Sequence, residues 1–316
     1  MKMMKNAIVA QSGGPTTAIN ASLAGVIKGC LESHEIDVLY GALNGVEGLM
    51  DERLVNLTDI FDHNEENLNV LKLTPAMYLG SCRRKLKDVD QDSSEYDIII
   101  NIFRKYHIHY FFYIGGNDSM DTVGKMSRYV KEHQMDVKVI GIPKTIDNDL
   151  VVTDHTPGFG SAARYVAASV LEMAHDTYIY NTKSVLIAEI MGRDAGWLTA
   201  ASVLARNSYS RAPHLIYLPE HPFSKEQFIE DIKAQFKQRE HIVIAVSEGL
   251  RDVDGHYISA ETAAVDAFGH ATLSGTGKCL EGLVAEKFGC KVRSVEINVL
   301  QRWRRPQISR RAGSWG

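Results

Sequence analysis

A lysine, a threonine and two aspartates follow an apolar segment near the middle of the chain, in Pro143-Lys144-Thr145-Ile146-Asp147-Asn148-Asp149. The apolar residues before them, 139–142, have the character of a buried strand in a parallel sheet. Ligands of open α/β sheets bind beyond the carboxyl ends of such strands, so a cation and two carboxylates here could face a substrate and move a proton. The alternative is a polar loop in which Asp147 and Asp149 cap a helix or a turn.

Two glycine pairs, Gly13-Gly14 and Gly115-Gly116, each stand between an apolar run and an amphipathic segment. The first turn of a helix has unpaired N–H groups and a positive dipole end, so a glycine-rich turn there can hold phosphate. Neither pair has the GxGxxG or the Walker spacing, and each could be only a tight βα turn. Asp118, two residues after the second pair, could hold Mg²⁺, repel one kind of phosphate or cap the helix.

One pattern of apolar run, polar turn and amphipathic helix repeats along the chain. Such repeats predict the α/β class, with two doubly wound, Rossmann-like domains built on mainly parallel sheets. No linker separates the two domains in the sequence, so we expect them to share a cleft with the active site in it. We expect a first domain at 1–150 and a second at 151–302, although late strands could return to the first. The predicted strands are 6–11, 110–114, 139–143, 183–190, 215–220, 241–246 and 295–300; the predicted helices are 18–31, 97–105, 120–130, 159–178, one from Trp197, and one to Arg239 that opens with a Ser224/Gln227 capping box.

Composition excludes several classes of protein. The 316 residues, 45% of them hydrophobic, fit two α/β domains. A net charge of −4 gives no general attraction to nucleic acid or to an anionic membrane, and no apolar stretch approaches the ~18 residues of a membrane span. The four cysteines stand apart without CxxC spacing, which predicts reduced thiols in a cytoplasmic protein rather than a zinc site or disulfides.

The last fourteen residues, 303–316, differ in composition from the rest of the chain. They hold two of the three tryptophans and four arginines, with neither helical nor strand periodicity. We expect this tail to lie outside the fold and to be non-native sequence in a chain that is cut short. A native basic tail is the alternative. A shortened product would expose apolar surface and would aggregate or show little activity.

Seven short motifs occur in the order and approximate spacing of the phosphofructokinases, and the chain resembles this family over residues 6–302. Within the family it resembles the pyrophosphate-dependent branch. The resemblance implies Mg²⁺-dependent, reversible phosphoryl transfer from diphosphate to the 1-hydroxyl of fructose 6-phosphate in glycolysis, by a homodimer or homotetramer. An ATP-dependent kinase of the same fold and a truncated, non-catalytic sugar-phosphate-binding relative are the alternatives. The motifs are Gly13-Gly14-Pro15-Thr16, Gly80-Ser81-Cys82-Arg83, Gly115-Gly116-Asn117-Asp118-Ser119, Pro143 to Asp149, Met191-Gly192-Arg193, Ser247-Glu248-Gly249 and Leu300-Gln301-Arg302.

The resemblance also implies roles for individual residues. Asp147 matches the general base. Asp118 and Lys144 stand where ATP-using relatives carry glycine, and both differences favour the shorter donor. Asn117 occupies the metal position, where most relatives have aspartate, and an amide oxygen is a weaker ligand for Mg²⁺. The remaining matches are Gly13, Gly14, Arg83 and Gly116 for the phosphoryl donor, and Thr145, Ile146, Asp149, Met191, Gly192, Arg193, Glu248, Arg302 and, across a subunit interface, Arg293 for the sugar phosphate.

Overall fold

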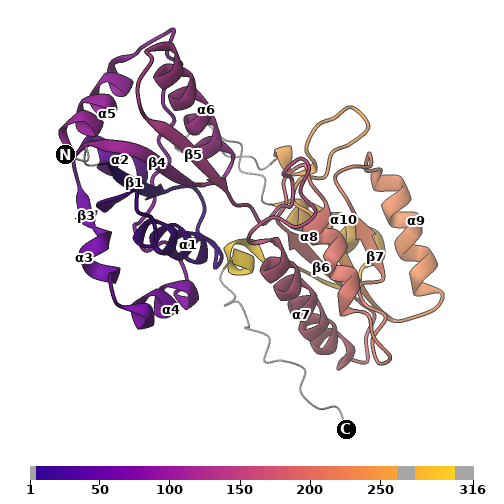
Figure 1. Cartoon of the computed structure of the whole chain (residues 1–316). Helices are drawn as coiled ribbons and strands as arrows, with labels where there is room; N and C mark the ends of the chain where they lie inside the picture. The colour runs from indigo at the N-terminus through magenta and orange to yellow at the C-terminus, as the bar shows by residue number, and fades with distance from the viewer. Residues whose placement is uncertain (1–4, 262–274, 303–316) are drawn as a thin grey trace. The chain divides into compact units, whose positions relative to one another are not determined.

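The computed structural model describes residues 5–261 and 275–302, and the chain divides into two compact units (Figure 1). Unit 1 ends at Thr145 and unit 2 begins at Ile146, five residues before the boundary expected at 150. The tail at 303–316 lies outside the described residues. No helix in the described part of the chain is both long and apolar enough to cross a membrane.

Unit 1 is built on a five-stranded sheet in the order β3-β2-β1-β4-β5. β1 pairs in parallel with β2 and β4, β4 pairs in parallel with β5, and β3 is antiparallel to β2. Gln11 is level with Ile114, and Gly115 is level with Pro143, so β1, β4 and β5 end together. The strands are β1 Asn6–Gln11, β2 Leu39–Ala42, β3 Leu54–Asn56, β4 Ile108–Gly115 and β5 Lys138–Pro143.

Helices cover both faces of this sheet, as Figure 1 shows. One core lies under α2 Gly45–Met50, α5 Ser94–Lys105 and α6 Asn117–Glu132; the other lies under α1 Ile19–Leu31, α3 Leu57–Phe61 and α4 Glu65–Leu73.

Three predictions for unit 1 need correction. α6 begins at Asn117 rather than at 120, so Asn117 and Asp118 lie in its first turn and not in a loop. α5 likewise begins at Ser94 rather than at 97. β5 is only partly buried, because it pairs with β4 alone at one end of the strand order.

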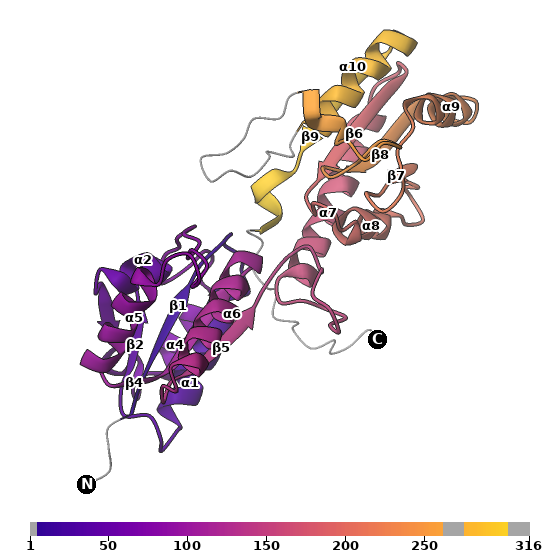
Figure 2. The same ribbon diagram turned by 90° about the horizontal axis from the view of Figure 1, so that it is seen from above.

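Unit 2 carries a four-stranded, fully parallel sheet in the order β7-β8-β6-β9. One face packs on α7, α8 and the 3₁₀ helix η1, and the other on α9 and α10 (Figure 2). The elements are α7 Phe159–Tyr178, β6 Ser184–Ile190, α8 Trp197–Ala201, η1 Ser202–Ala205, β7 Leu215–Tyr217, α9 Lys225–Phe236, β8 His241–Ser247, η2 Ile258–Glu261, α10 Thr276–Phe288, β9 Lys291–Glu296 and η3 Asn298–Arg302.

The prediction of a strand at 295–300 is wrong for most of its length. β9 ends at Glu296, and Asn298, with φ of 45°, opens the 3₁₀ helix η3. The apolar residues Val299 and Leu300 produced the strand pattern, but their side chains are exposed. β9 pairs with β6, so this late strand stays in unit 2.

The helix cap predicted at Ser224 forms only in part. The Ser224 hydroxyl accepts the Gln227 N–H at 3.1 Å, which caps α9. The Gln227 amide donates to Asp231 at 2.8 Å instead of reaching back, so the reciprocal half of a capping box is missing.

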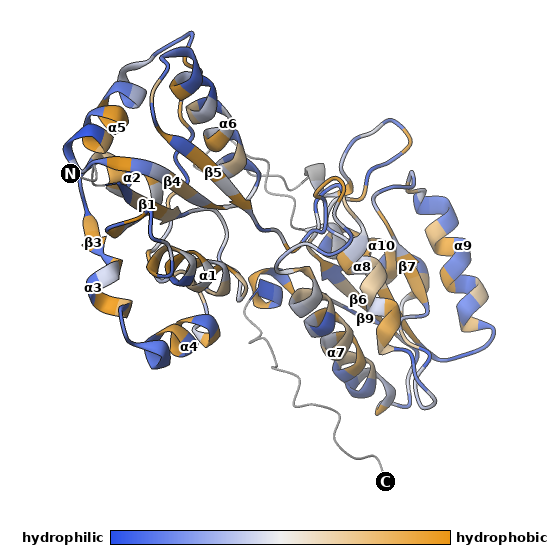
Figure 3. Cartoon of the chain, in the orientation of Figure 1, coloured by the Kyte–Doolittle hydropathy of each residue, from blue (hydrophilic) through white to orange (hydrophobic). Residues whose placement is uncertain are grey.

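Hydrophobic and hydrophilic residues alternate along α9 in Figure 3, because one side of this helix packs on the sheet.

Glu189, near the end of β6, holds the first residues of α10. Its two oxygens accept the N–H groups of Gly275 at 3.1 Å and Gly277 at 2.7 Å, and its side chain is buried. Burial raises the pKa of this carboxyl to about 7 against the effect of the two N–H donors, and the negative charges of Glu296 and Glu248 add to the rise. Ionising Glu189 therefore costs the folded state free energy.

We expect Glu189→Gln to change the pH dependence of stability. Because the folded-state pKa lies above the ordinary value near 4.5, the wild type loses stability as the pH rises from about 5 to about 7. Glutamine does not ionise, so between pH 5 and pH 8 the difference in unfolding free energy should shift in favour of the variant by on the order of 1–3 kcal/mol. Urea unfolding at both pH values measures this shift. The exposed control Glu286→Gln should show no shift, and a pH-independent difference for Glu189→Gln would contradict the prediction.

Candidate active site

The turns after β1 and β4 meet at the end of the sheet in unit 1. A Cβ atom placed on Gly13 would lie 3.5 Å from the backbone nitrogen of Gly116 and 3.8 Å from Nζ of Lys144. A Cβ atom on Gly116 would lie 3.7 Å from the same Nζ. The Lys144 ammonium therefore lies beside both glycine turns, where backbone N–H groups and a cation can together hold a phosphate.

Local contacts fix this arrangement. Lys144 follows β5, its N–H donates to the carbonyl of Gly115 at 2.9 Å, and its side chain is 5% exposed. The hydroxyls of Ser12 and Ser119 lie 2.5 Å apart and connect the first turn of α6 to the end of β1. A Cβ atom on Gly115 would lie 2.0 Å from the Ser119 hydroxyl, so this contact requires glycine at 115. Gly14 lies half-buried beside Gly13.

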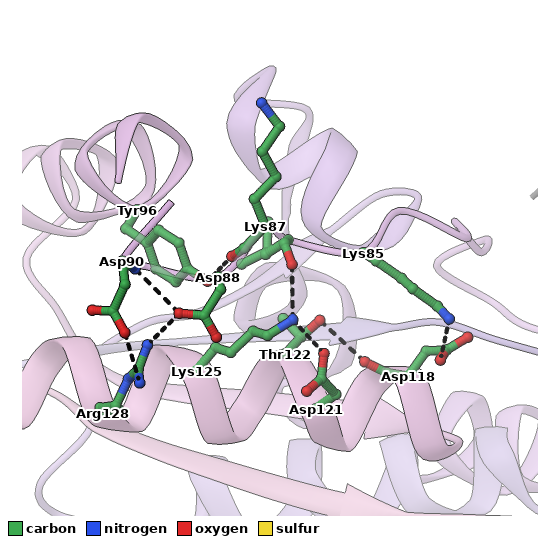
Figure 4. Close-up of polar contacts among 11 residues, drawn as sticks. Lys85, Lys87, Asp88, Asp90, Tyr96, Asp118, Asp121, Thr122, Lys125 and Arg128 are labelled. Carbon is green, nitrogen blue, oxygen red and sulfur yellow. Dashed lines mark hydrogen bonds and ion pairs between the residues drawn. The ribbon is translucent and has the colours of Figure 1, made fainter. Parts of the chain in front are cut away.

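Asn117 and Asp118 are exposed in the first turn of α6. Asp118 Oδ1 lies 3.0 Å from Nζ of Lys85. Figure 4 shows the two side chains facing each other. Lys85 is the last of three consecutive cations, residues 83–85, in the loop before α5. The side chain of Arg84 turns to Glu95, with its Nε 2.8 Å from Oε1, while Arg83 is exposed. The structure thus separates three side chains that the sequence presents as one basic run.

The oxygen donors at this turn fit a magnesium ion that is shared with a substrate. Asn117 and Asp118 offer an amide oxygen and a carboxylate from adjacent residues. Within residues 5–261 and 275–302, no group of three carboxylate, imidazole or thiolate ligands lies here; Asp252, Asp254 and His256 form such a group elsewhere. Mg²⁺ commonly takes one or two protein oxygens and completes its shell with water and phosphate oxygens, so two donors suffice for a metal bound with its substrate.

A second cluster lies in unit 2, around Glu248 at the end of β8. Oε1 of Glu248 accepts the N–H groups of Gly192 at 3.2 Å and Arg193 at 3.1 Å, from the turn after β6. Burial raises the pKa of this carboxyl, the two N–H donors lower it, and the negative charge of Asp147 raises it further. Asp147 is therefore a close electrostatic neighbour of Glu248.

Backbone contact sets the position of the Gly192-Arg193 turn. A Cβ atom on Gly249 would lie 1.7 Å from the carbonyl oxygen of Arg193, closer than any side chain allows. A Cβ atom on Gly192, whose φ is +151°, would lie 2.4 Å from the carbonyl oxygen of Ala195. Glycine at 249 therefore lets the turns after β6 and β8 touch, and glycine at 192 lets the turn after β6 close on itself.

Asn148 shapes the loop that carries Asp147 and Asp149. It has φ of 59°, in the left-handed region that asparagine tolerates better than most residues. Its Oδ1 accepts the Thr156 N–H at 2.9 Å, and its Nδ2 donates to the Asp154 carbonyl at 3.1 Å. Asn148 is buried, Asp147 is half-buried and Asp149 is exposed. The turn-forming role is thus carried by the asparagine between the two aspartates.

Replacing Asn148 by alanine removes two hydrogen bonds and places a less tolerant residue at a positive φ. We expect a loss of about 1–3 kcal/mol in unfolding free energy, measured by urea unfolding. Asn148→Gly keeps the backbone freedom and should lose less, while Thr153→Ala in the same loop is the exposed control. Equal losses for the alanine and glycine variants would show that the positive φ contributes nothing.

The other predicted residues differ in their exposure. Thr145 and Ile146, the last residue of unit 1 and the first of unit 2, are buried. Met191 is half-buried after β6. Arg193 is exposed, and Arg302 ends η3, which packs on α7. Arg293 is exposed on β9, and its Nη1 lies 3.9 Å from Oδ2 of Asp176.

The model of the phosphofructokinase family matches residues 6–299. The chain belongs to this family. It is 40% identical over 300 residues to the pyrophosphate–fructose 6-phosphate 1-phosphotransferase of Halomonas elongata, covering 94% of this chain and 71% of the relative. It is 42% identical over 302 residues to the Rhodospirillum rubrum protein of the same name, with coverages of 93% and 72%. A crystal structure of the pyrophosphate-dependent phosphofructokinase from Marinobacter aquaeolei superposes with a TM-score of 0.79 at 36% identity, over 95% of this chain and 69% of that one.

Within this phosphofructokinase fold, sequence reasoning missed Lys85, Asn148 and the Ser12–Ser119 contact. Lys85 was visible only as one of three adjacent cations. The left-handed conformation of Asn148 had a weak signal, because asparagine is enriched there. Nothing in the sequence linked Ser12 to Ser119, which are 107 residues apart.

Proposed function

We propose that the chain transfers a phosphoryl group reversibly between diphosphate and the 1-hydroxyl of fructose 6-phosphate, giving fructose 1,6-bisphosphate and phosphate. The observation that carries this proposal is the cradle in unit 1, where the buried ammonium of Lys144 lies beside Gly13 and Gly116. The names of the Halomonas elongata and Rhodospirillum rubrum relatives support the same reaction.

Asp147 serves as the general base in this proposal and takes the proton of the sugar hydroxyl as the phosphoryl group arrives. Two residues separate it from Lys144 in the chain, so their Cα atoms are at most about 11 Å apart. Asp147 therefore follows the donor cradle closely along the chain, and its charge acts on Glu248 within unit 2. Positioning and charge stabilisation provide most of the catalysis in phosphoryl transfer.

Two residues near the cradle favour diphosphate over a nucleotide as the phosphoryl donor. Asp118, in the first turn of α6, places a carboxylate where a longer nucleotide donor needs room for its further phosphate. Lys144 adds a cation for a short donor that lacks a nucleoside to hold it. The exposed Arg83 in the loop before α5 contributes further positive charge on the donor side.

Family membership implies a divalent metal, and we propose Mg²⁺ held by Asn117 together with water and donor oxygens. When bound, the metal neutralises donor oxygens. Glu248 and Met191 with Gly192 hold the sugar, while Arg193, Arg302 and an Arg293 supplied across a subunit interface hold its phosphate. Thr145, Ile146 and Asp149 support the same site. This assignment includes a cytoplasmic homodimer or homotetramer acting in glycolysis.

A donor comparison with the purified protein tests the proposal. The protein is supplied with fructose 6-phosphate, Mg²⁺ and either diphosphate or ATP, and fructose 1,6-bisphosphate is measured with a coupled aldolase assay. We expect kcat/KM to be higher with diphosphate than with ATP by at least about two decades. A preference for ATP would overturn the donor assignment. Binding of fructose 6-phosphate without turnover of either donor would indicate a non-catalytic relative.

A further inference from the structure

Two ion pairs and a hydrogen bond attach the loop after Arg83 to one side of α6 (Figure 4). At the start of the helix, Lys85 pairs with Asp118 at 3.0 Å. About two turns later, Lys125 donates to the carbonyl of Leu86 at 2.9 Å and lies 2.7 Å from Asp121 of the same helix. Further along, Arg128 pairs with Asp88 at 2.7 Å. The pair nearest to the glycine turns is therefore the one formed by Lys85 and Asp118.

The backbone on both sides of Lys85 is held in place. Leu86 is 1% exposed in the core of unit 1, and Lys125 binds its carbonyl. On the other side, Arg84 bonds to Glu95, whose side chain is 12% exposed. The side chains of Lys85 and Asp118 are 48% and 56% exposed. The backbone on both sides of Lys85 is thus fixed by contacts of its neighbours, while the side chain of Lys85 is exposed to solvent. The loop is therefore held without the Lys85–Asp118 pair.

Asp118 places a carboxylate where an anionic donor would bind. It stands two residues after Gly116, in the first turn of α6, where N–H groups and the helix dipole favour an anion. A bound diphosphate would therefore meet a carboxylate next to its own negative charge, and like charges repel most strongly where water is displaced. A cation paired with Asp118 removes this repulsion while the carboxylate still occupies its space.

We propose that Lys85 is a positioning residue for the diphosphate donor, and that its ammonium cancels the charge of Asp118 beside the donor phosphates. Asp118 then restricts donor length by its size, without weakening the binding of diphosphate. This role rests on the proposed function, since it concerns the same donor site. It assigns to Lys85 a task distinct from that of Lys144, whose buried ammonium faces the cradle directly.

A double-mutant cycle between Lys85 and Asp118 tests the proposal. Methylenediphosphonate, which mimics diphosphate but cannot transfer a phosphoryl group, is titrated calorimetrically with Mg²⁺ into the wild type, Lys85→Met, Asp118→Asn and the double variant. We expect Lys85→Met to weaken binding at least about tenfold, and the double variant to return to within about threefold of the wild type. Lys87→Met is the matched control, because Lys87 lies in the same loop and pairs with Asp92 at 2.9 Å; it should bind as the wild type does.

Two results would overturn the role of Lys85. Unchanged binding by Lys85→Met would show that its charge does not matter for the donor. A double variant as weak as Lys85→Met would show that Lys85 does not act through Asp118. In the supporting case, the KM for diphosphate rises in Lys85→Met while the KM for fructose 6-phosphate stays within about twofold, which a general loss of structure would not produce.

The titration also separates this inference from the proposed function, because it needs no turnover. A wild type that binds methylenediphosphonate but transfers phosphate only from ATP would end the proposed function, and the cycle would still decide the role of Lys85. A wild type that does not bind the probe would overturn the role of Lys85.

Discussion

Replacing Asp147 by alanine is expected to lower kcat by at least about two decades, while KM for fructose 6-phosphate stays within a few-fold. A general base acts as the proton leaves in the transition state, so its loss affects turnover more than binding. The buried Glu248, which accepts two backbone N–H groups and keeps the Gly192-Arg193 turn in place, remains in the variant. Steady-state kinetics with diphosphate and Mg²⁺ measure both parameters.

The matched control for this experiment is Asp154→Ala, an exposed aspartate whose backbone carbonyl, but not its carboxylate, is bonded by Asn148. It should leave kcat within about twofold. Near-normal turnover of a clean Asp147→Ala preparation would remove Asp147 from the role of base. A large rise in KM with unchanged kcat would instead assign it to sugar binding.

The second large effect is expected from the double variant Asp118→Gly, Lys144→Gly. Loss of the buried ammonium beside Gly13 and Gly116 should reduce kcat/KM for diphosphate by at least about two decades. Loss of the Asp118 carboxylate opens room for a longer donor, so measurable use of ATP should appear. Parallel assays with each donor, together with circular dichroism to confirm folding, measure the outcome.

The double variant Asp136→Gly, Lys138→Gly is its control, because it makes the same two changes at the opposite end of β5. It should keep the diphosphate preference of the wild type. Retention of full diphosphate activity by the site variant would show that Lys144 is not part of the donor site. A loss of diphosphate use with no gain of ATP use would show that Asp118 does not select the donor by its length.

Sequence patterns predicted the elements that tertiary contacts did not modify. β1 and α7 have the predicted bounds, since the first is a continuous apolar run and the second keeps its helical periodicity over twenty residues. The start of α6 was missed because Asn117 and Asp118 are typical turn residues, yet Gly116 precedes them as the N-cap and they enter the helix. β9 was misplaced because Val299 and Leu300 have strand character, while its partner β6 ends at Ile190, one residue after the last pair between the two strands.

The candidate site was predictable where strand ends bring residues together. Parallel strands that end level place Gly13, Gly116 and Lys144 at one edge, so their meeting follows from the topology. The partners of Arg84 and Lys85 could not be predicted, because adjacent cations in a loop have no periodicity that indicates the direction of each side chain. The two side chains point in different directions because Leu86 is buried and because α6 begins at Asn117.

The division of the chain at Thr145 has a consequence for its synthesis on the ribosome. Every strand and helix of unit 1 is encoded before the first residue of unit 2, and none of the described elements of unit 1 waits for a later segment. At ~5–20 residues per second, translation of residues 146–302 takes roughly 10–30 s, ample time for a domain of this size to fold. The nascent chain can thus form the cradle of Gly13, Gly116 and Lys144 while the segment that carries Glu248 is still being translated. A phosphate ligand that binds in this cradle would then stabilise the unfinished chain.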